Sequence, residues 1–203
     1  AIMEDSGKNL WIGTWNGVSL LSGGTFSNFT TRNGLPDNFI YSIIRDSEGN
    51  TWFGTHGGAS CLASRNVKTY TIEEGLPNRM VFNIVQDRKN RYWFGTSEGL
   101  SSFTRGKFTN YSTRDGLPSN MINNLLVDRN DDLWVSTPNG LGIFSSGTFK
   151  NFKEKDGLTC GMVFQLIQAR DGTVWIGTCQ GLSRYSGGKF SASPFTAGMG
   201  SIY

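Results

Sequence analysis

The chain has 203 residues, of which 37% are hydrophobic, 13% aromatic and 17% charged, and this composition excludes a disordered chain. The net charge of +3 is too small and too dispersed for a phosphate-binding surface, so we expect no nucleic-acid partner. No segment approaches the roughly 18 apolar residues of a membrane span, and the N-terminal residues do not have the pattern of a signal peptide.

An internal repeat organises the whole sequence. Tryptophans recur at intervals of 41 residues, at Trp11, Trp52, Trp93, Trp134 and Trp175. Two glycine positions keep the same interval: Gly17, Gly58, Gly99, Gly140 and Gly181, and Gly34, Gly75, Gly116, Gly157 and Gly198. Five copies of one unit account for the chain, so we expect a single domain over residues 1–203.

Each unit has the pattern of four short strands. Residues 116–156 contain the β-rich runs MINNLLV, LWVST, LGIF and TFKNF, separated by Asp, Asn, Gly, Ser and Pro. None is long enough for an amphipathic helix. A four-stranded meander cannot bury both of its faces alone, so the units should pack face to face. The sequence therefore predicts an all-β fold, a five-bladed β-propeller of four-stranded antiparallel blades.

Three repeated residues have structural explanations in this fold. The turn between the first two strands, as in DSEGN at 46–50, uses an aspartate that can bond to the backbone. Gly17 and its equivalents occupy a turn that excludes a Cβ atom. The tryptophan rings should fill the space between neighbouring blades and be mostly buried.

These residues resemble a known family. The string of GLP, a strand, D-x-x-G-N, L-W-I-G-T and x-x-G-L, matched at residues 34–58 and in four further copies, is similar to the two-component regulator propeller repeat. The fourth unit departs from it at Thr159 and Ala169, and the last unit at Ser193. The resemblance implies a sensory propeller of a bacterial hybrid histidine kinase, located in the periplasm or outside the cell.

The two ends of the sequence are continuous in the repeat. Tyr203 followed by Ala1 gives GMGSIYAIMEDSGKNLWIGT, which parallels GLPDNFIYSIIRDSEGNTWFGT with two residues missing. We expect the termini to meet in one blade and close the ring, which would give a monomer. Self-assembly through the same seam is the alternative, and a fragment of a longer array is also possible.

A binding surface is predicted where the loops vary within the repeated frame. In a propeller the GLP loops and the turns between the second and third strands emerge on one face. The varying residues that we expect to contact a ligand are Trp15, Asn16, His56, Arg79, Ser97, Glu98, Asn139, Cys179 and Gln180, with Asp37, Asn120 and Cys160 nearby. The ligand would be a small molecule, a glycan by the resemblance, or a protein.

The sequence offers little for catalysis. No Ser–His–Asp triad is indicated, because the single histidine, His56, would have to serve every role. No nucleotide-binding motif occurs. The turn acids Asp5, Asp46, Asp87 and Asp128 are spread around the ring, so we expect neither a metal nor a cofactor. An alternative is a lyase or glycosidase that uses His56 with Glu98 as an acid and base pair.

The three cysteines have no zinc-ligand spacing. Cys61 should be an inert core thiol. Cys160 and Cys179 should lie on the loop face of one blade, where a reduced pair is favoured over a disulfide, although spacing alone leaves both open.

Overall fold

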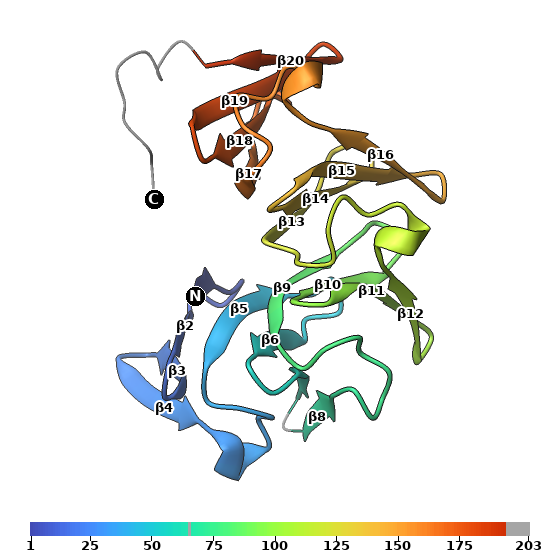
Figure 1. Ribbon diagram of the computed structural model, residues 1–203. Coiled ribbons are helices and arrows are strands. Elements are labelled where there is room, and N and C mark those ends of the chain that lie inside the picture. Colours follow the sequence, from blue (N-terminus) through green and yellow to red (C-terminus); the bar gives the residue numbers. More distant parts are fainter. Residues whose placement is uncertain (65, 194–203) are drawn as a thin grey trace. The chain divides into compact units, whose positions relative to one another are not determined.

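A computed structural model describes residues 1–64 and 66–193. Within these residues the chain forms five four-stranded antiparallel sheets, each with its strands in chain order (Figure 1). Each sheet is a meander of one repeat, and we number the sheets as blades 1 to 5 along the chain. The all-β, four-strand organisation expected from the 41-residue repeat is confirmed.

The strands have the following bounds. Blade 1 contains β1 (Ile2–Glu4), β2 (Leu10–Thr14), β3 (Gly17–Ser22) and β4 (Thr25–Phe29). Blade 2 contains β5 (Ile40–Arg45), β6 (Thr51–Thr55), β7 (Ala59–Ala63) and β8 (Asn66–Tyr70). Blade 3 contains β9 (Val81–Gln86), β10 (Tyr92–Thr96), β11 (Gly99–Thr104) and β12 (Lys107–Tyr111). Blade 4 contains β13 (Asn124–Val127), β14 (Leu133–Thr137), β15 (Gly140–Ser145) and β16 (Thr148–Phe152). Blade 5 contains β17 (Val163–Gln168), β18 (Val174–Thr178), β19 (Gly181–Ser186) and β20 (Lys189–Ala192).

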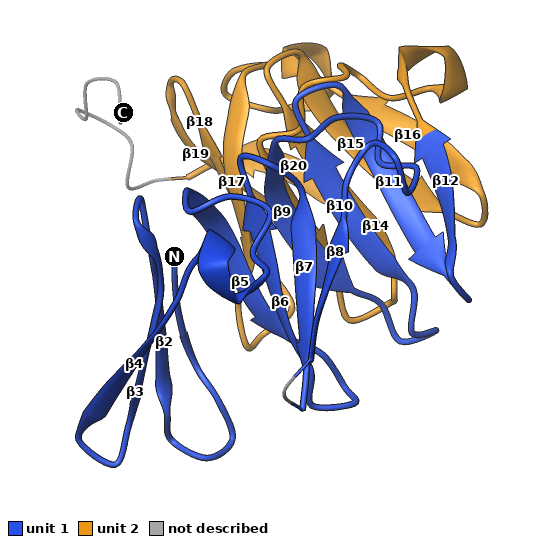
Figure 2. Cartoon of the chain, turned by 90° about the horizontal axis from the view of Figure 1, so that it is seen from below, with its two compact units in different colours: residues 1–110 blue, residues 111–203 orange. Residues whose placement is uncertain are grey.

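The chain divides into two compact units, residues 1–110 and 111–203 (Figure 2). The first unit holds blades 1 and 2 and nearly all of blade 3, and the second holds blades 4 and 5. A single domain over residues 1–203 therefore stays a prediction. The expected meeting of the termini depends on residues 194–203, which lie outside the described residues.

Short 3-10 turns, which the sequence pattern did not predict, follow three of the outer strands: η1 (Thr31–Asn33), η2 (Thr113–Asp115) and η3 (Glu154–Asp156). Each ends at a glycine with positive φ, and the first ends at Gly34 with φ 96°. This conformation favours glycine because an L side chain would be strained there. The glycine of the GLP segment therefore turns the chain from one blade into the next.

Four of the five repeated tryptophans are buried as expected. The exposed fractions of Trp11, Trp52, Trp93 and Trp134 are 4%, 3%, 0% and 2%. Trp175 in blade 5 is only half-buried. Within each unit, the core of a blade boundary thus contains one buried indole ring, that of Trp11, Trp52 or Trp134.

The rings pack against the following blade within each unit. The ring centroid of Trp11 lies 5.7 Å from that of Phe53, and the centroid of Trp134 lies 5.0 Å from that of Tyr185. Aromatic pairs at such distances contribute about 0.5–1.5 kcal/mol beyond the area that they bury. The packing role predicted for the tryptophans is confirmed at these boundaries.

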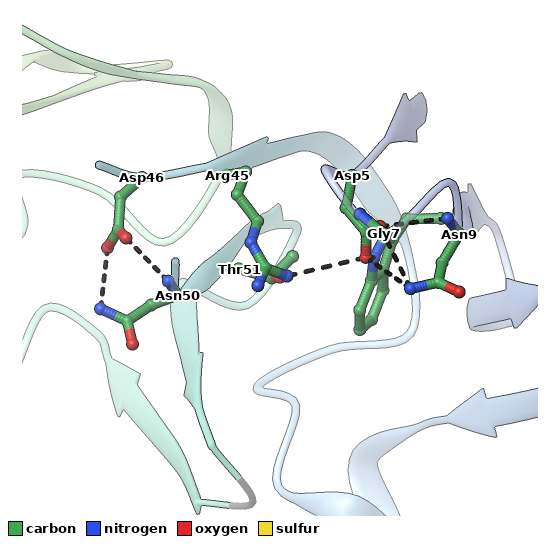
Figure 3. Close-up of polar contacts among 8 residues, drawn as sticks. Asp5, Gly7, Asn9, Arg45, Asp46, Asn50 and Thr51 are labelled. Atoms are coloured by element: carbon green, nitrogen blue, oxygen red, sulfur yellow. Dashed lines mark hydrogen bonds and ion pairs between the residues drawn. The ribbon is translucent and has the colours of Figure 1, made fainter. Parts of the chain in front are cut away.

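The repeated turn aspartate has a second role that the sequence pattern did not indicate. Asp46 Oδ1 accepts a hydrogen bond of 2.7 Å from the backbone N–H of Asn50 (Figure 3). It also accepts one of 3.0 Å from the backbone N–H of Glu48, and the two bonds fix the turn. Asp46 Oδ2 accepts a bond of 2.9 Å from the indole nitrogen of Trp52. The turn therefore also holds the ring at the centre of the blade boundary. In blade 5 the aspartate is replaced by Ala169, which cannot accept such a bond from Trp175.

The glycine between the second and third strands is required by its surroundings. Gly58 has φ 145°, and a Cβ atom there would collide with the carbonyl oxygen of Tyr70. Gly17 has φ 106° and faces the carbonyl oxygen of Phe29 in the same way. The expected exclusion of a Cβ atom is confirmed.

Side chains of the outer strands fasten the loops that lead into their own blades. Thr69 Oγ1 on β8 donates to the carbonyl oxygen of Gly34 at 2.8 Å. Asn110 Nδ2 on β12 donates to the corresponding oxygen of Gly75 at 2.9 Å. In the second unit, Asn151 Nδ2 on β16 donates to Gly116 at 2.9 Å. All three bonds join residues 35 positions apart, so they belong to the repeat.

Candidate ligand-binding surface

The two sets of loops predicted to share a face lie side by side within individual blades. The backbone N–H of His56, in the turn after β6, donates to the carbonyl oxygen of Phe39 at 3.1 Å. In blade 4, Asn139 Nδ2 donates to the carbonyl oxygen of Pro118 at 3.2 Å. Each bond joins a GLP loop to the turn between the second and third strands. The varying residues of a blade are thereby brought to one edge of its sheet.

Four aromatic side chains form a continuous row in the first unit. Trp15, in the turn after β2, is 80% exposed and stacks on Phe39 with ring centroids 5.7 Å apart and an interplanar angle of 14°. Phe39 contacts Tyr41 on β5 at 4.8 Å, and Tyr41 contacts Phe82 on β9 at 4.9 Å. We call these four residues the aromatic row. It crosses blades 1, 2 and 3 and is not needed to fill a blade core.

Polar groups lie beside the aromatic row. The ring of His56 is 6.4 Å from that of Phe39 and 6.5 Å from that of Tyr41. His56 Nδ1 lies 4.0 Å from Asp37 Oδ2, and Asp37 Oδ1 accepts a hydrogen bond from the backbone N–H of Phe39 at 2.7 Å. Burial and the nearby charge of Asp37 raise the pKa of the Tyr41 hydroxyl, so it is a neutral hydrogen-bonding group at neutral pH.

The structure brings two of the predicted ligand contacts to this row and places the others elsewhere. Trp15 begins the row and His56 borders it. Asn16 is exposed beside Trp15, and its backbone N–H donates to Thr14 Oγ1 at 3.0 Å. In blade 3, Arg79 and Glu98 are exposed, whereas the buried hydroxyl of Ser97 makes no hydrogen bond among the described residues. In blade 5, Gln180 is exposed.

Two predicted contacts are engaged by the protein itself. Besides its bond to Pro118, Asn139 accepts a hydrogen bond at Oδ1 from Lys153 Nζ at 3.1 Å. Cys179 is joined to Cys160 by a disulfide, with Cα atoms 5.9 Å apart. The expectation of a reduced pair was therefore wrong. Sequence spacing could not show that the GLP loop and the β18–β19 turn approach each other this closely.

The alternative acid and base pair is arranged differently from the prediction. Among the described residues, the carboxylate at ion-pair distance from His56 belongs to Asp37, and no ion pair joins His56 to Glu98. Within the same part of the chain, no group of three or more His, Cys, Asp or Glu side chains is placed to hold a metal ion.

The variation in the turns did not predict Phe39, Tyr41 and Phe82, because these residues lie at or just before the beginning of the first strand of a blade. A signal was present at 41-residue intervals. Positions 80, 121 and 162, equivalent to Phe39, are all methionine, and Met121 and Met162 are 45% and 42% exposed. Large apolar residues that stay exposed at one repeated position indicate a contact surface.

The repeats match a family. The description of that family is "Two component regulator propeller", and it matches residues 34–57, 75–98, 116–139 and 157–180. Four segments of this chain are two-component regulator propeller repeats. These four matches cover units that the internal pattern had already delimited, so the resemblance seen in the sequence is confirmed.

Solved structures show the same fold. The extracellular domain of the predicted hybrid two-component system BT3049 from B. thetaiotaomicron is 25% identical, with a TM-score of 0.82, over 92% of this chain and 27% of that one. The extracellular domain of a second such system, BT4673, is 27% identical with a TM-score of 0.76, over 90% of this chain and 26% of that one. This propeller thus spans about a quarter of the length of these extracellular domains.

A more distant structural neighbour is virginiamycin B lyase from Staphylococcus aureus, 16% identical with a TM-score of 0.77 over 95% of this chain and 69% of that one. At this identity the likeness shows the β-propeller fold alone. No curated protein matched the sequence. None of the helical segments in the described residues has the length and apolar character required to cross a bilayer.

Proposed function

We propose that this propeller is a ligand-binding part of a two-component sensor, and that it binds a saccharide along the aromatic row. The observation that carries the proposal is the exposed Trp15 ring stacked on Phe39, continued by Tyr41 and Phe82. The repeat family and the two neighbours from hybrid two-component systems support the sensor role.

The chemistry of the row suits a neutral sugar. Pyranose rings have an apolar C–H face and a rim of hydroxyl groups, so they stack on aromatic rings while bonding to polar side chains. Trp15 supplies an open ring face, and Asp37, His56 and the Tyr41 hydroxyl supply donors and acceptors beside it. The row is an open surface, so it suits an extended oligosaccharide better than a single sugar unit, which would need an enclosing pocket.

A cellular location outside the cytoplasm is consistent with the same proposal. The Cys160–Cys179 disulfide would persist in an oxidising compartment, whereas cytosolic thiols are kept reduced. The neighbours from the two hybrid two-component systems are described as extracellular domains. We therefore place the propeller in the periplasm or outside the cell.

The test is binding of defined oligosaccharides, such as maltohexaose, cellohexaose and xylohexaose, measured by calorimetry and by the shift of the melting temperature. Trp15→Ala should weaken the binding of the recognised sugar at least ten-fold and leave the melting temperature of the free protein nearly unchanged, since the side chain is 80% exposed. Phe26→Ala is the matched control, because Phe26 on β4 of the same blade is 59% exposed and lies outside the row.

Binding that is unaffected by Trp15→Ala would show that the sugar contacts another surface. Absence of binding to a wide panel of neutral and acidic oligosaccharides would overturn the saccharide assignment and favour a protein ligand.

A further inference from the structure

A cavity at the boundary between blades 4 and 5 has no role in the proposed saccharide site. Its volume is about 340 Å³, which is in the range of small-molecule sites. The side chains that line it include Asp128, Asp132, Trp134, Phe152 and Tyr185. Two carboxylates therefore face a space with aromatic walls.

The equivalent turns in blades 1 to 3 show what this position normally contains. The residue four places after the turn aspartate is a donor to that aspartate: Asn9 Nδ2 bonds to Asp5 and Asn50 Nδ2 to Asp46. In blade 3, Arg91 Nε donates to Asp87 at 2.7 Å. Each turn carboxylate is thus compensated by a neighbouring side chain.

Blade 4 replaces this donor by a second acid, Asp132. Asp128 is 7% exposed, and its Oδ2 accepts a side-chain hydrogen bond of 3.0 Å from the Trp134 indole nitrogen. The side chain of Asp132 is half-buried, and among the described residues it makes no hydrogen bond or ion pair. Lys150 also lines the cavity, but among the described residues it forms no ion pair with Asp128 or Asp132. Two carboxylates that lack an ion-pair partner at the edge of a cavity attract a positive charge.

The following blade also fails to supply a donor here. At the boundary of blades 2 and 3, the Tyr92 hydroxyl donates to Asp46 Oδ2 at 2.7 Å, and at the boundary of blades 1 and 2, Arg45 Nη1 lies 3.7 Å from Asp5 Oδ2. The residue of blade 5 equivalent to Tyr92 is Val174, which is smaller and has no polar atom in its side chain. Val174 therefore cannot donate to Asp128 as Tyr92 donates to Asp46.

We propose that this cavity binds an organic ammonium group, the charge of which would contact Asp128 and Asp132 while its carbon skeleton lies against Trp134, Phe152 and Tyr185. Cation–π contacts favour such a ligand, and the wall already accepts one, because Lys150 Nζ lies 5.2 Å from the ring centroid of Phe152. Lys68 lies over Tyr70 in the same way in blade 2, so the packing of Lys150 on a ring of its own blade recurs in a second repeat.

The test uses benzylammonium as the probe and benzyl alcohol, which has a similar shape without the charge, as the control ligand. Binding is followed by the NMR signal of the Trp134 indole N–H, identified by its loss in Trp134→Phe, because this group bonds to Asp128. We expect a saturable shift with benzylammonium and at least a ten-fold weaker response to benzyl alcohol.

Two variants restore what other blades contain. Melting curves of the free proteins verify that each is folded, which matters most for Val174→Tyr because Val174 is only 1% exposed. Asp132→Asn recreates the asparagine of blades 1 and 2 and should weaken benzylammonium binding at least five-fold. Val174→Tyr recreates Tyr92 and should abolish it. Glu48→Gln, which removes an exposed carboxylate from the equivalent turn of blade 2, should leave the affinity unchanged.

Equal binding of benzyl alcohol, or unchanged affinity in both Asp132→Asn and Val174→Tyr, would overturn the proposal. A shift of the Trp134 signal by calcium chloride that Asp132→Asn abolishes, without a response to benzylammonium, would show an inorganic cation site instead. None of these outcomes depends on whether the aromatic row binds a saccharide.

Discussion

The Tyr92 hydroxyl donates a 2.7 Å hydrogen bond to Asp46 Oδ2 and so joins a strand of blade 3 to the turn of blade 2. Burial raises the pKa of Asp46, but the hydrogen bonds from Tyr92, Trp52 and Asn50 outweigh this effect and lower it below its ordinary value. Burial and the adjacent Asp46 carboxylate raise the pKa of Tyr92. The phenol is therefore a neutral donor to a buried negative charge.

Removing this donor should destabilise the first unit. Tyr92→Phe keeps the ring in the core and deletes only the hydroxyl, so we expect a loss of about 2 kcal/mol in the free energy of unfolding, as for other hydrogen bonds to charged groups. Denaturant unfolding with tryptophan fluorescence would measure it. Tyr185→Phe, at the rim of the blade 4–5 cavity, is the control. An equal and small effect of both substitutions would argue against a special role for the Tyr92 bond.

Stability should fall in acid because of Asp5. Burial alone would raise the pKa of this carboxyl, but hydrogen bonds from Trp11, Asn9 and Gly7 lower it from 3.8 to about 2. A lowered pKa stabilises the folded state above the unfolded value, and this stabilisation is lost as the pH falls from about 4 towards 2. Denaturant unfolding between pH 6 and pH 2.5 should show a smaller decline for Asp5→Asn than for the original chain. Glu4→Gln, at an exposed neighbouring position, should retain the full decline.

The buried tryptophans should differ from the one in blade 5. Trp93 is 0% exposed, and its indole nitrogen donates to Asp87 at 3.0 Å, so Trp93→Ala should cost about 3–5 kcal/mol through the cavity that it leaves. Trp175 is half-buried, and Ala169 offers it no carboxylate, so Trp175→Ala should cost clearly less. Equilibrium unfolding would rank the two. A loss below about 1 kcal/mol for Trp93→Ala would contradict its packing role.

Substitutions at two turn glycines distinguish the cost of a steric collision from the cost of backbone strain. Gly58→Ala should cost more than about 2 kcal/mol, because its Cβ atom would meet the carbonyl oxygen of Tyr70 in addition to the strain of φ 145°. Gly147→Ala also imposes a positive φ, of 88°, but its Cβ atom would meet nothing within 4 Å. About 1 kcal/mol is expected there. Similar melting temperatures for the two variants would show that the collision is relieved by movement of β8.

The disulfide gives a direct chemical prediction. Thiol titration in denaturant without reductant should find one free thiol, that of Cys61, for which burial raises the pKa to about 11 in the folded protein. The bridge closes a segment of 19 residues, so reduction should cost about 3 kcal/mol in chain entropy. The loss would appear as a lower melting temperature in dithiothreitol. Three titratable thiols would show that the bridge does not form.

Much of the fold was predictable from the sequence because the same pattern of strands and turns occurs in five copies. The interval between Trp11 and Trp52 defined the unit, and the positions of glycine and aspartate located its turns. The candidate site was predicted less completely. Trp15 and His56 were found as variations in turns. Phe39 and Phe82 are linked only through Tyr41, because β5 and β9 of neighbouring blades lie side by side.

The disulfide and the cavity were not predicted, for the same physical reason. The disulfide depends on the distance between two loops, and the cavity beside Asp128 is completed by Tyr185 from the next blade. Both are relationships between segments that a single repeat does not contain. Comparison of equivalent positions, such as Asn9, Asn50 and Asp132, indicates which unit differs, but the structure is needed to show what lies opposite.

The bonds from Thr69 to Gly34, from Asn110 to Gly75 and from Asn151 to Gly116 bear on how such a protein can evolve. Each spans 35 positions, less than one 41-residue period, and joins an incoming loop to the last strand of the same blade. A duplicated segment of one period that begins at the loop therefore carries both the donor and the acceptor. Gene duplication can therefore add a blade that already contains this hydrogen bond. Later substitutions can then give the duplicated copy a different role.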